Sequence, residues 1–321
     1  MLRFRCSPRG VRALSLPVLT LFALTGCTAA GQGTPAPSST STMSSIQHIH
    51  GLGADPLTGD TYAATHQGMW LIPTKTLPPS YLEGAPRSTT DEPVQIGGRE
   101  QDVMGFTVAA PGLLLASGHP APTEQNDWNL PNLGLISSTD GADSWTPVAL
   151  QGETDFHDLA AVPMADGMRV YGYDAGAGSV SVSDDSGATW SARAVLPLRD
   201  LAVDPARPDR VFATTAEGLT MSDDAGRTFG LVPGAPGLLV VEAVDAAWGA
   251  GLVGIDPAGA VWRQEGLAEA WTQTGTIRGT PEAFTFVGGG SPWILVADDH
   301  GIAASADYGV TWTDLVTAPS E

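Results

Sequence analysis

An eight-residue motif recurs along this chain and limits what the chain can fold into. It reads Ser-x-Asp-x-Gly-x-Thr-Trp at residues 183–190, with further copies at 138–145, 222–229 and 305–312. The serine and aspartate side chains can bond to nearby backbone amides, the glycine supplies a turn with positive φ, and the aromatic residue re-enters a core. Each copy therefore predicts the turn of a β-hairpin. The aspartates with this structural role are Asp140, Asp185, Asp224 and Asp307.

Apolar strand patterns between these turns repeat at the spacing of a propeller blade. Their first residues are Leu52, Phe106, Leu159, Leu201, Glu242 and Phe284. The intervals of roughly 40 to 55 residues suit four short strands with their turns, and the 39 glycines and 25 prolines argue against long helices. We therefore predict an all-β protein, a six-bladed β-propeller over residues 46–318. Seven blades is the main alternative, but no unassigned segment is long enough to supply another blade.

Three blades depart from the regular pattern. Blade one has a proline-rich insertion at 73–93 in place of the motif, and blade five keeps only Trp262 and Trp271 as remnants of it. In blade two, an insertion at 120–131 is expected to overhang one mouth of the central channel. Trp128 in that insertion would be a lid, a platform for a sugar, or a structural residue.

The first 26 residues have the pattern of an export signal. Four arginines precede the apolar run 13–24, and Leu-Thr-Gly-Cys closes the pattern at Cys27. This ending is similar to a bacterial lipobox, which predicts that Cys27 is acylated and that 27–45, rich in Ser, Thr and Pro, is a flexible tether. The expected location is extracytoplasmic, on the outer face of a bacterial cell membrane, with the membrane as partner through the lipid. An ordinary cleaved secretory signal is the alternative.

The charge balance narrows the classes of partner. The sequence holds 15 Lys and Arg against 35 Asp and Glu, a net charge of −20. This balance disfavours nucleic acid and anionic lipid headgroups, and it leaves cations and neutral polymers such as a saccharide open. Cys6 lies in the predicted signal and Cys27 would carry lipid, so the folded part has no cysteine for a disulfide or a thiolate ligand. We expect the protein to be a monomer.

Five of the six histidines fall in the first half of the chain, at positions that repeat from blade to blade. Aligning the strand starts places His50, Met104 and His157 at one structural position, followed by Arg199 in blade four. Equivalent positions in a propeller form a ring. We therefore expect His50, Met104 and His157 to supply metal ligands at the channel mouth.

Three more histidines are expected around this ring, namely His48, His66 and His119, as further ligands or as groups that orient the ligands. His66 and His119 both follow a second strand, and His48 lies two residues before His50. Imidazole and thioether without thiolate suit copper, while zinc on imidazoles alone is the less favoured choice. In the alternative interpretation, these histidines are separate polar residues that cap strand ends.

Carboxylates near the same mouth allow a second interpretation. Asp158 beside His157 is expected to fix the tautomer of that imidazole. A glycosidase would instead use two carboxyl groups as acid and base across a sugar, and the candidates are Asp102, Asp158, Asp200 and Glu282. Exposed aspartates are commonly just solvated, so the sequence leaves catalysis open.

The repeated motif resembles the Asp-box of BNR-repeat propellers, a family that includes sialidases and sortilin-like receptors. The histidine-bearing stretches resemble a group of bacterial Asp-box lipoproteins that are commonly labelled glycosyl hydrolases or exo-sialidase-like; these stretches are 48–52, 64–68, 102–108, 117–120 and 155–157. The resemblance implies a propeller in which the Asp-box marks the fold and carries no catalytic residue. The three-arginine cluster and the Arg-Ile-Pro motif of sialidases are not found here, so fold analogy alone does not assign a reaction.

Overall fold

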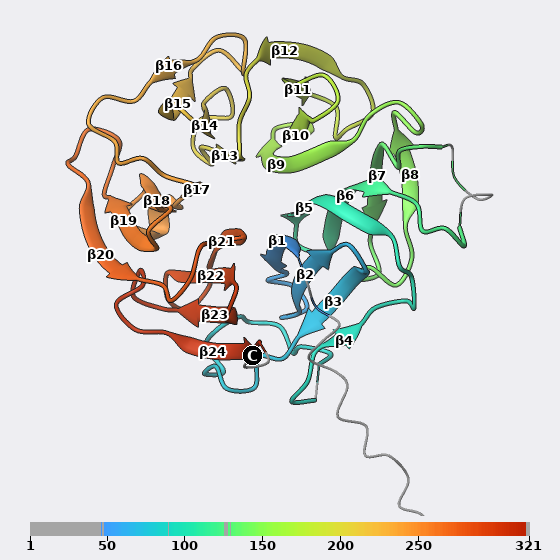
Figure 1. The fold of residues 1–321 in the computed structure, drawn as a ribbon, viewed down its shortest axis with the longest axis horizontal. Coiled ribbons are helices and arrows are strands. Elements are labelled where there is room, and N and C mark those ends of the chain that lie inside the picture. The colour runs from blue at the N-terminus through green and yellow to red at the C-terminus, as the bar shows by residue number, and fades with distance from the viewer. Residues whose placement is uncertain (1–45, 47, 89, 125–127, 129, 319–321) are drawn as a thin grey trace, which may run out of the picture. The chain divides into compact units, whose positions relative to one another are not determined.

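The computed structural model describes residues 46, 48–88, 90–124, 128 and 130–318. The predicted signal at 1–26, and the acylated Cys27 with its tether at 27–45, lie outside these residues. Six four-stranded antiparallel sheets are arranged as a ring (Figure 1), which confirms the six-bladed β-propeller. In the described part of the chain, the one helical element is the short 3₁₀ turn η1 (Ala246–Trp248).

Each blade is a meander of consecutive strands. Blades one to three are β1 (Ile49–Ala54), β2 (Thr61–Thr65), β3 (Gly68–Ile72) and β4 (Val94–Gln95); β5 (Asp102–Ala110), β6 (Leu113–His119), β7 (Leu135–Ser138) and β8 (Thr146–Ala149); and β9 (Phe156–Met164), β10 (Gly167–Asp174), β11 (Ser179–Ser183) and β12 (Ser191–Val195). Blades four to six are β13 (Asp200–Val203), β14 (Val211–Thr215), β15 (Gly218–Ser222) and β16 (Gly230–Leu231); β17 (Val240–Ala243), β18 (Leu252–Ile255), β19 (Ala260–Gln264) and β20 (Thr272–Thr276); and β21 (Ala283–Gly288), β22 (Trp293–Asp298), β23 (Gly301–Ser305) and β24 (Thr313–Thr317).

The hydrophobic core lies between the blades. Second strands such as β2 are buried along their whole length, because the faces of one sheet pack against the sheets on either side. The core consists of six clusters, each of which joins two consecutive blades. The cluster that contains Trp70 and Trp293 joins blade six to blade one, so packing runs around the whole ring.

The proline-rich insertion at 73–93 reinforces the junction between the last blade and the first. In the described part of the chain no strand is exchanged between these two blades, so other contacts must close the ring. The Tyr81 ring meets the Trp293 ring edge to face, with centroids 5.3 Å apart, and the backbone N–H of Gly290 donates to the Ser80 carbonyl at 3.1 Å. The insertion therefore helps to hold blade six against blade one where the ring closes.

The four repeated motifs form hairpin turns between the third and fourth strands, here named the Ser-x-Asp turns (138–145, 183–190, 222–229 and 305–312). In blade three, Asp185 accepts the backbone N–H of Thr189 at 2.8 Å and the Thr189 hydroxyl at 2.7 Å. The corresponding aspartates of the other three turns make the same pair of bonds. In an antiparallel meander these turns lie at the opposite end of the sheet from the start of the first strand.

No helix in the described residues has the length and the apolar character to span a membrane.

Candidate functional site

A β-bulge opens the innermost strand in each of the first three blades, at the equivalent position. The pairing register shifts between Ile49 and Gly51 in β1, between Val103 and Gly105 in β5, and opposite Tyr173 and Asp174 in β9. The extra residues are His50, Met104 and His157. A bulge redirects a side chain out of the regular ladder and is common beside functional sites. The alignment of these three residues therefore has a structural basis that the sequence did not show.

The same position continues around the ring with different residues. Arg199, Leu239 and Glu282 each donate their backbone N–H to the carbonyl at the end of the neighbouring second strand, at 2.8–2.9 Å. This equivalence corrects the sequence alignment of blade five by one residue: Val241, which pairs with Gly254, is the counterpart of Leu201, which pairs with Ala213. The ring is thus His-Met-His over blades one to three and Arg-Leu-Glu over blades four to six.

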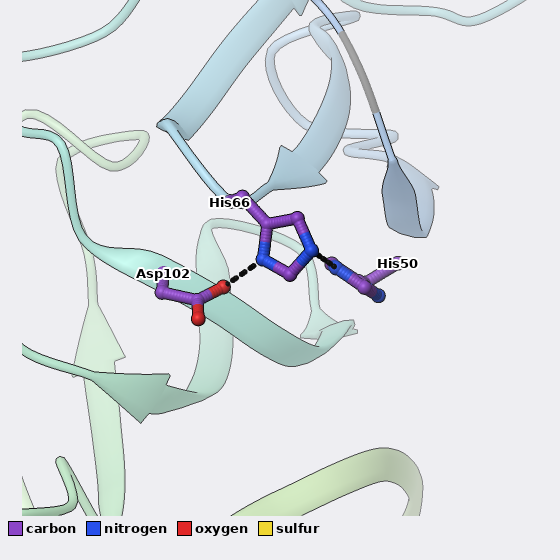
Figure 2. A group of neighbouring side chains, drawn as sticks. All are labelled: His50, His66 and Asp102. Atoms are coloured by element: carbon purple, nitrogen blue, oxygen red, sulfur yellow. Dashed lines mark hydrogen bonds and ion pairs between the residues drawn. The ribbon is translucent and has the colours of Figure 1, made fainter.

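His50 is paired with His66, as Figure 2 shows, rather than with His157. The two Nε2 atoms are 3.3 Å apart and the ring centroids 4.4 Å apart. On its other side, His66 Nδ1 lies 2.6 Å from Asp102 Oδ1. His50, His66 and Asp102 each offer one ligand atom, and these three atoms lie within 4.8 Å of one another, so the group could hold a metal ion.

Polar contacts extend from this group across the mouth into blade three. Asp102 Oδ2 lies 3.3 Å from Nδ1 of His119. Nε2 of His119 is 3.5 Å from Asp155 Oδ2, which is also 2.7 Å from Nε2 of His157. Two aspartates thus link four histidines from three blades into one line, which we call the histidine chain (His50, His66, Asp102, His119, Asp155 and His157).

Asp155 is the member of the histidine chain that the sequence analysis did not single out, and it replaces Asp158 in the expected role. Asp158 Oδ1 accepts the backbone N–H of Leu159 and its Oδ2 accepts that of Leu201, so Asp158 does not orient His157. Asp155 precedes His157 by two residues, and residues two apart on an extended segment face the same way. The two-residue spacing between Asp155 and His157 was therefore the feature of the sequence that could have identified Asp155. Asp155 Oδ1 is buried without a partner.

Of the remaining predicted ligands, His48 lies beside the pair and Met104 lies at the equivalent bulge of the next blade. The His48 ring centroid is 5.4 Å from that of His66, and His48 is exposed with a left-handed φ of 54°. Met104 is half-buried at the bulge of β5.

The electrostatic surroundings distinguish the two ends of the histidine chain. Burial, followed by the nearby His66, lowers the pKa of His50 to about 4. The hydrogen bond to Asp155 is the main cause that raises the pKa of His157 above its usual value. His50 is therefore a neutral imidazole with a free electron pair at pH 7, which is the form that binds metal ions.

A central cavity of about 370 Å³ opens at the mouth, where His50, His157, Arg199 and Glu282 line it. Farther in, the wall includes Asp158 and Asp200, whereas Asp102, the fourth candidate carboxylate, is part of the histidine chain.

Three wall carboxylates each accept a backbone N–H from the next blade of the ring. Asp158 accepts the Leu201 N–H, Asp200 accepts the Val241 N–H at 2.6 Å, and Glu282 accepts the Ile49 N–H at 3.2 Å. Burial raises the pKa of Asp158 to about 6, and burial together with the Asp158 charge raises that of Asp200. These carboxylates are held in structural bonds, and two of them, Asp158 and Asp200, keep their proton to a higher pH than an ordinary aspartate does.

No family model and no curated protein matches this sequence. Solved structures do resemble the fold. The GH74 enzyme of Niastella koreensis superposes with a TM-score of 0.52 at 16% identity, over 84% of this chain and 38% of the enzyme. An ancestral GH74 enzyme gives 0.53 at 11% identity, over 83% of this chain and 46% of the enzyme.

A chain of a nidogen/laminin complex gives a TM-score of 0.58 at 12% identity, over 79% of this chain and 92% of that chain. The protein thus spans less than half the length of either GH74 enzyme. At such identities the likeness establishes the β-propeller fold and no activity.

Proposed function

We propose that this propeller is a metal-binding protein whose ion is held by the imidazoles of His50 and His66. The observation that carries the proposal is the 3.3 Å separation of their Nε2 atoms. Two nitrogens that bind one tetrahedral ion, each at about 2.0–2.1 Å, lie roughly 3.3 Å apart. The two rings would therefore accept an ion without moving far.

The contact between His66 and Asp102 supports this role. A carboxylate only accepts hydrogen bonds, so His66 Nδ1 must carry the hydrogen that lies toward Asp102 Oδ1 at 2.6 Å. In the neutral ring, that arrangement leaves the electron pair of His66 on Nε2, facing His50. A carboxylate behind a ligating histidine fixes the ring and makes its nitrogen more basic. Asp102 would thus act on the ion through His66.

Copper is the ion that we propose first. The donors at the equivalent bulge positions are imidazole and the thioether of Met104, the sequence has no cysteine after Cys27, and thioether is a soft ligand that selects copper(I). His48, with its ring centroid 5.4 Å from that of His66, and Met104 at the neighbouring bulge are the candidates for further coordination positions. Zinc is the competing ion, since it binds imidazoles without needing the thioether. An extracytoplasmic, lipid-anchored location remains part of the same proposal and rests on the pattern that ends at Cys27.

The proposal is tested by titrating the metal-free protein with copper(I), copper(II) and zinc(II) against a competing chelator. We expect one high-affinity ion per chain, and loss of at least 100-fold in affinity for His50→Ala and for His66→Ala. His300→Ala is the control for a rival location, because His300 forms a second group of possible ligands with Asp298 and Asp299 on the turn between β22 and β23, and it should leave the affinity unchanged. Met104→Leu should weaken copper(I) and spare zinc. Unchanged affinity in both His50→Ala and His66→Ala would refute the site.

A glycoside hydrolase is the second candidate, favoured by one observation. The pKa of Asp158 is raised to about 6, and a carboxyl group whose pKa is raised toward neutral pH suits a general acid. Against this, Asp158, Asp200 and Glu282 are all occupied by backbone N–H groups. Turnover of a panel of aryl glycosides, lost in Asp158→Asn and retained in His66→Ala, would favour the hydrolase over the metal-binding protein.

A further inference from the structure

Blade five departs from the Ser-x-Asp turns at a place where the surface is hollowed. Gln264, the last residue of β19, stands where the other third strands end in Ser183, Ser222 and Ser305. Between this turn and the segment that follows β16 lies a groove of about 430 Å³. Its lining includes Pro233, Pro236, Trp262, Gln264, Glu269 and Trp271.

Both tryptophans in this groove pack on the core, and one of them is also fixed by a hydrogen bond. Trp262 Nε1 donates to Asp256 Oδ2 at 3.0 Å, and Asp256 is itself fixed because its Oδ1 accepts the N–H groups of Ala258 and Ala260. Both indoles are partly buried and pack against the cluster that joins blades four and five. Rigid aromatic side chains of this kind offer contact area at little entropic cost.

Polar atoms beneath the same groove lack hydrogen-bond partners. Gln264 is only 5% exposed, and its Nε2 donates to the Glu269 carbonyl at 2.8 Å, but its Oε1 has no partner. Trp271 Nε1 is also unpartnered, whereas the corresponding Trp190 of blade three donates to the Gly187 carbonyl at 2.8 Å. Buried polar groups are almost always paired, so this acceptor and this donor are two groups that a ligand in the groove could satisfy if it came within bonding distance of them.

We propose that this groove binds a neutral saccharide. Two aromatic faces can cover the C–H face of a sugar ring, and a sugar hydroxyl both donates and accepts hydrogen bonds, as Gln264 Oε1 and Trp271 Nε1 require. No Lys or Arg lines the groove, and Glu269 is present at it, so an anionic sugar would be repelled. The assignment is independent of the metal site, because the groove lies in blades four and five and the histidine pair in blade one.

The test is calorimetric titration of the full chain with four neutral hexasaccharides: cello-, xylo-, manno- and maltohexaose. We expect one of them to bind, and Trp271→Phe to weaken it at least 5-fold. Trp190→Phe makes the same change at the equivalent turn of blade three and should leave binding unchanged. No binding of any of the four at about 10 mM, which corresponds to a binding free energy weaker than roughly 2.7 kcal/mol, would overturn the proposal.

A measurement on the unaltered protein guards against misfolding of the variants. Bound hexasaccharide should protect Trp262 and Trp271 from oxidation by N-bromosuccinimide, with Trp190 as the internal reference that stays equally reactive. Equal oxidation with and without sugar would overturn the proposal. So would displacement of the sugar by a synthetic peptide of residues 28–45, because that result would assign the groove to the chain's own proline-containing segment.

Discussion

The two ends of the propeller use aspartate in opposite ways. At one end, each aspartate of the Ser-x-Asp turns bonds within its own turn, as Asp185 does to Thr189 four residues along the chain. At the mouth, Asp102 lies between His66 and His119, which come from two different blades and are 36 and 17 residues away in sequence. Local bonds that repeat four times define the fold, whereas long-range contacts that occur once per molecule build the candidate site.

The largest expected difference between the ends is in metal affinity. Asp102→Asn replaces a carboxylate that accepts from His66 Nδ1 by an amide that no longer fixes the ring, so the affinity for metal should fall by roughly 10- to 100-fold. Asp185→Asn makes the same chemical change at the other end and should leave affinity unchanged. Chelator competition measures both. Equal metal affinities in Asp102→Asn and the unaltered protein would show that Asp102 does not contribute to metal binding.

The cavity wall should impose a pH dependence of stability. The folded-state pKa of Asp158 is raised to about 6, against roughly 4 when unfolded, so the folded protein holds this proton more tightly. The stability from Asp158 is present below pH 4 and is lost as pH rises through 6. Asp158→Asn mimics the neutral acid, so its melting temperature should fall less between pH 4 and pH 7 than that of the unaltered protein. Parallel curves for the two proteins would contradict the raised pKa.

The fold followed from the sequence because its signals are local. A Ser-x-Asp turn needs only residues within eight positions of one another, and the blade spacing needs only the order of strands. The one-residue error in blade five arose where the turn motif is missing, so that Glu242 was taken for the counterpart of Leu201 in place of Val241. Local motifs therefore fix the register of the blades that carry them.

The candidate site could be predicted only in part. Alignment placed His50, Met104 and His157 at one position, but it could not show that this position is a bulge. A bulge changes the direction of a side chain, and His50 accordingly meets His66 of its own blade instead of the next residue of the ring. The direction of a side chain, unlike its position in the alignment, depends on how the strands pair, and a single sequence does not contain that information.

A smaller effect is expected from removing one turn aspartate. Asp307 accepts the N–H and the hydroxyl of Thr311 and the hydroxyl of Ser305. Asp307→Ala should lower the free energy of unfolding by about 1–2 kcal/mol, because the freed groups partly recover their bonds from water. Denaturant unfolding measures the loss, with Asp299→Ala, an exposed aspartate on the turn between β22 and β23, as control. A loss no larger than in the control would show that the turn bonds contribute nothing net.

The smallest expected effect is the acid dependence of a fully exposed turn, and it has the opposite sign from that of the cavity wall. Bonds from Thr228, first its hydroxyl and then its backbone N–H, lower the pKa of Asp224 to about 2. A lowered folded-state pKa means that the stability from Asp224 is present above its unfolded pKa of roughly 4 and is lost as pH falls toward 2. Because water screens the charge of Asp224, the melting temperature should change only gradually with pH. Asp224→Asn should flatten the pH dependence of the melting temperature only below pH 4, and Asp158→Asn only above it. A change of that slope near pH 6 in Asp224→Asn would therefore break the division between the two ends.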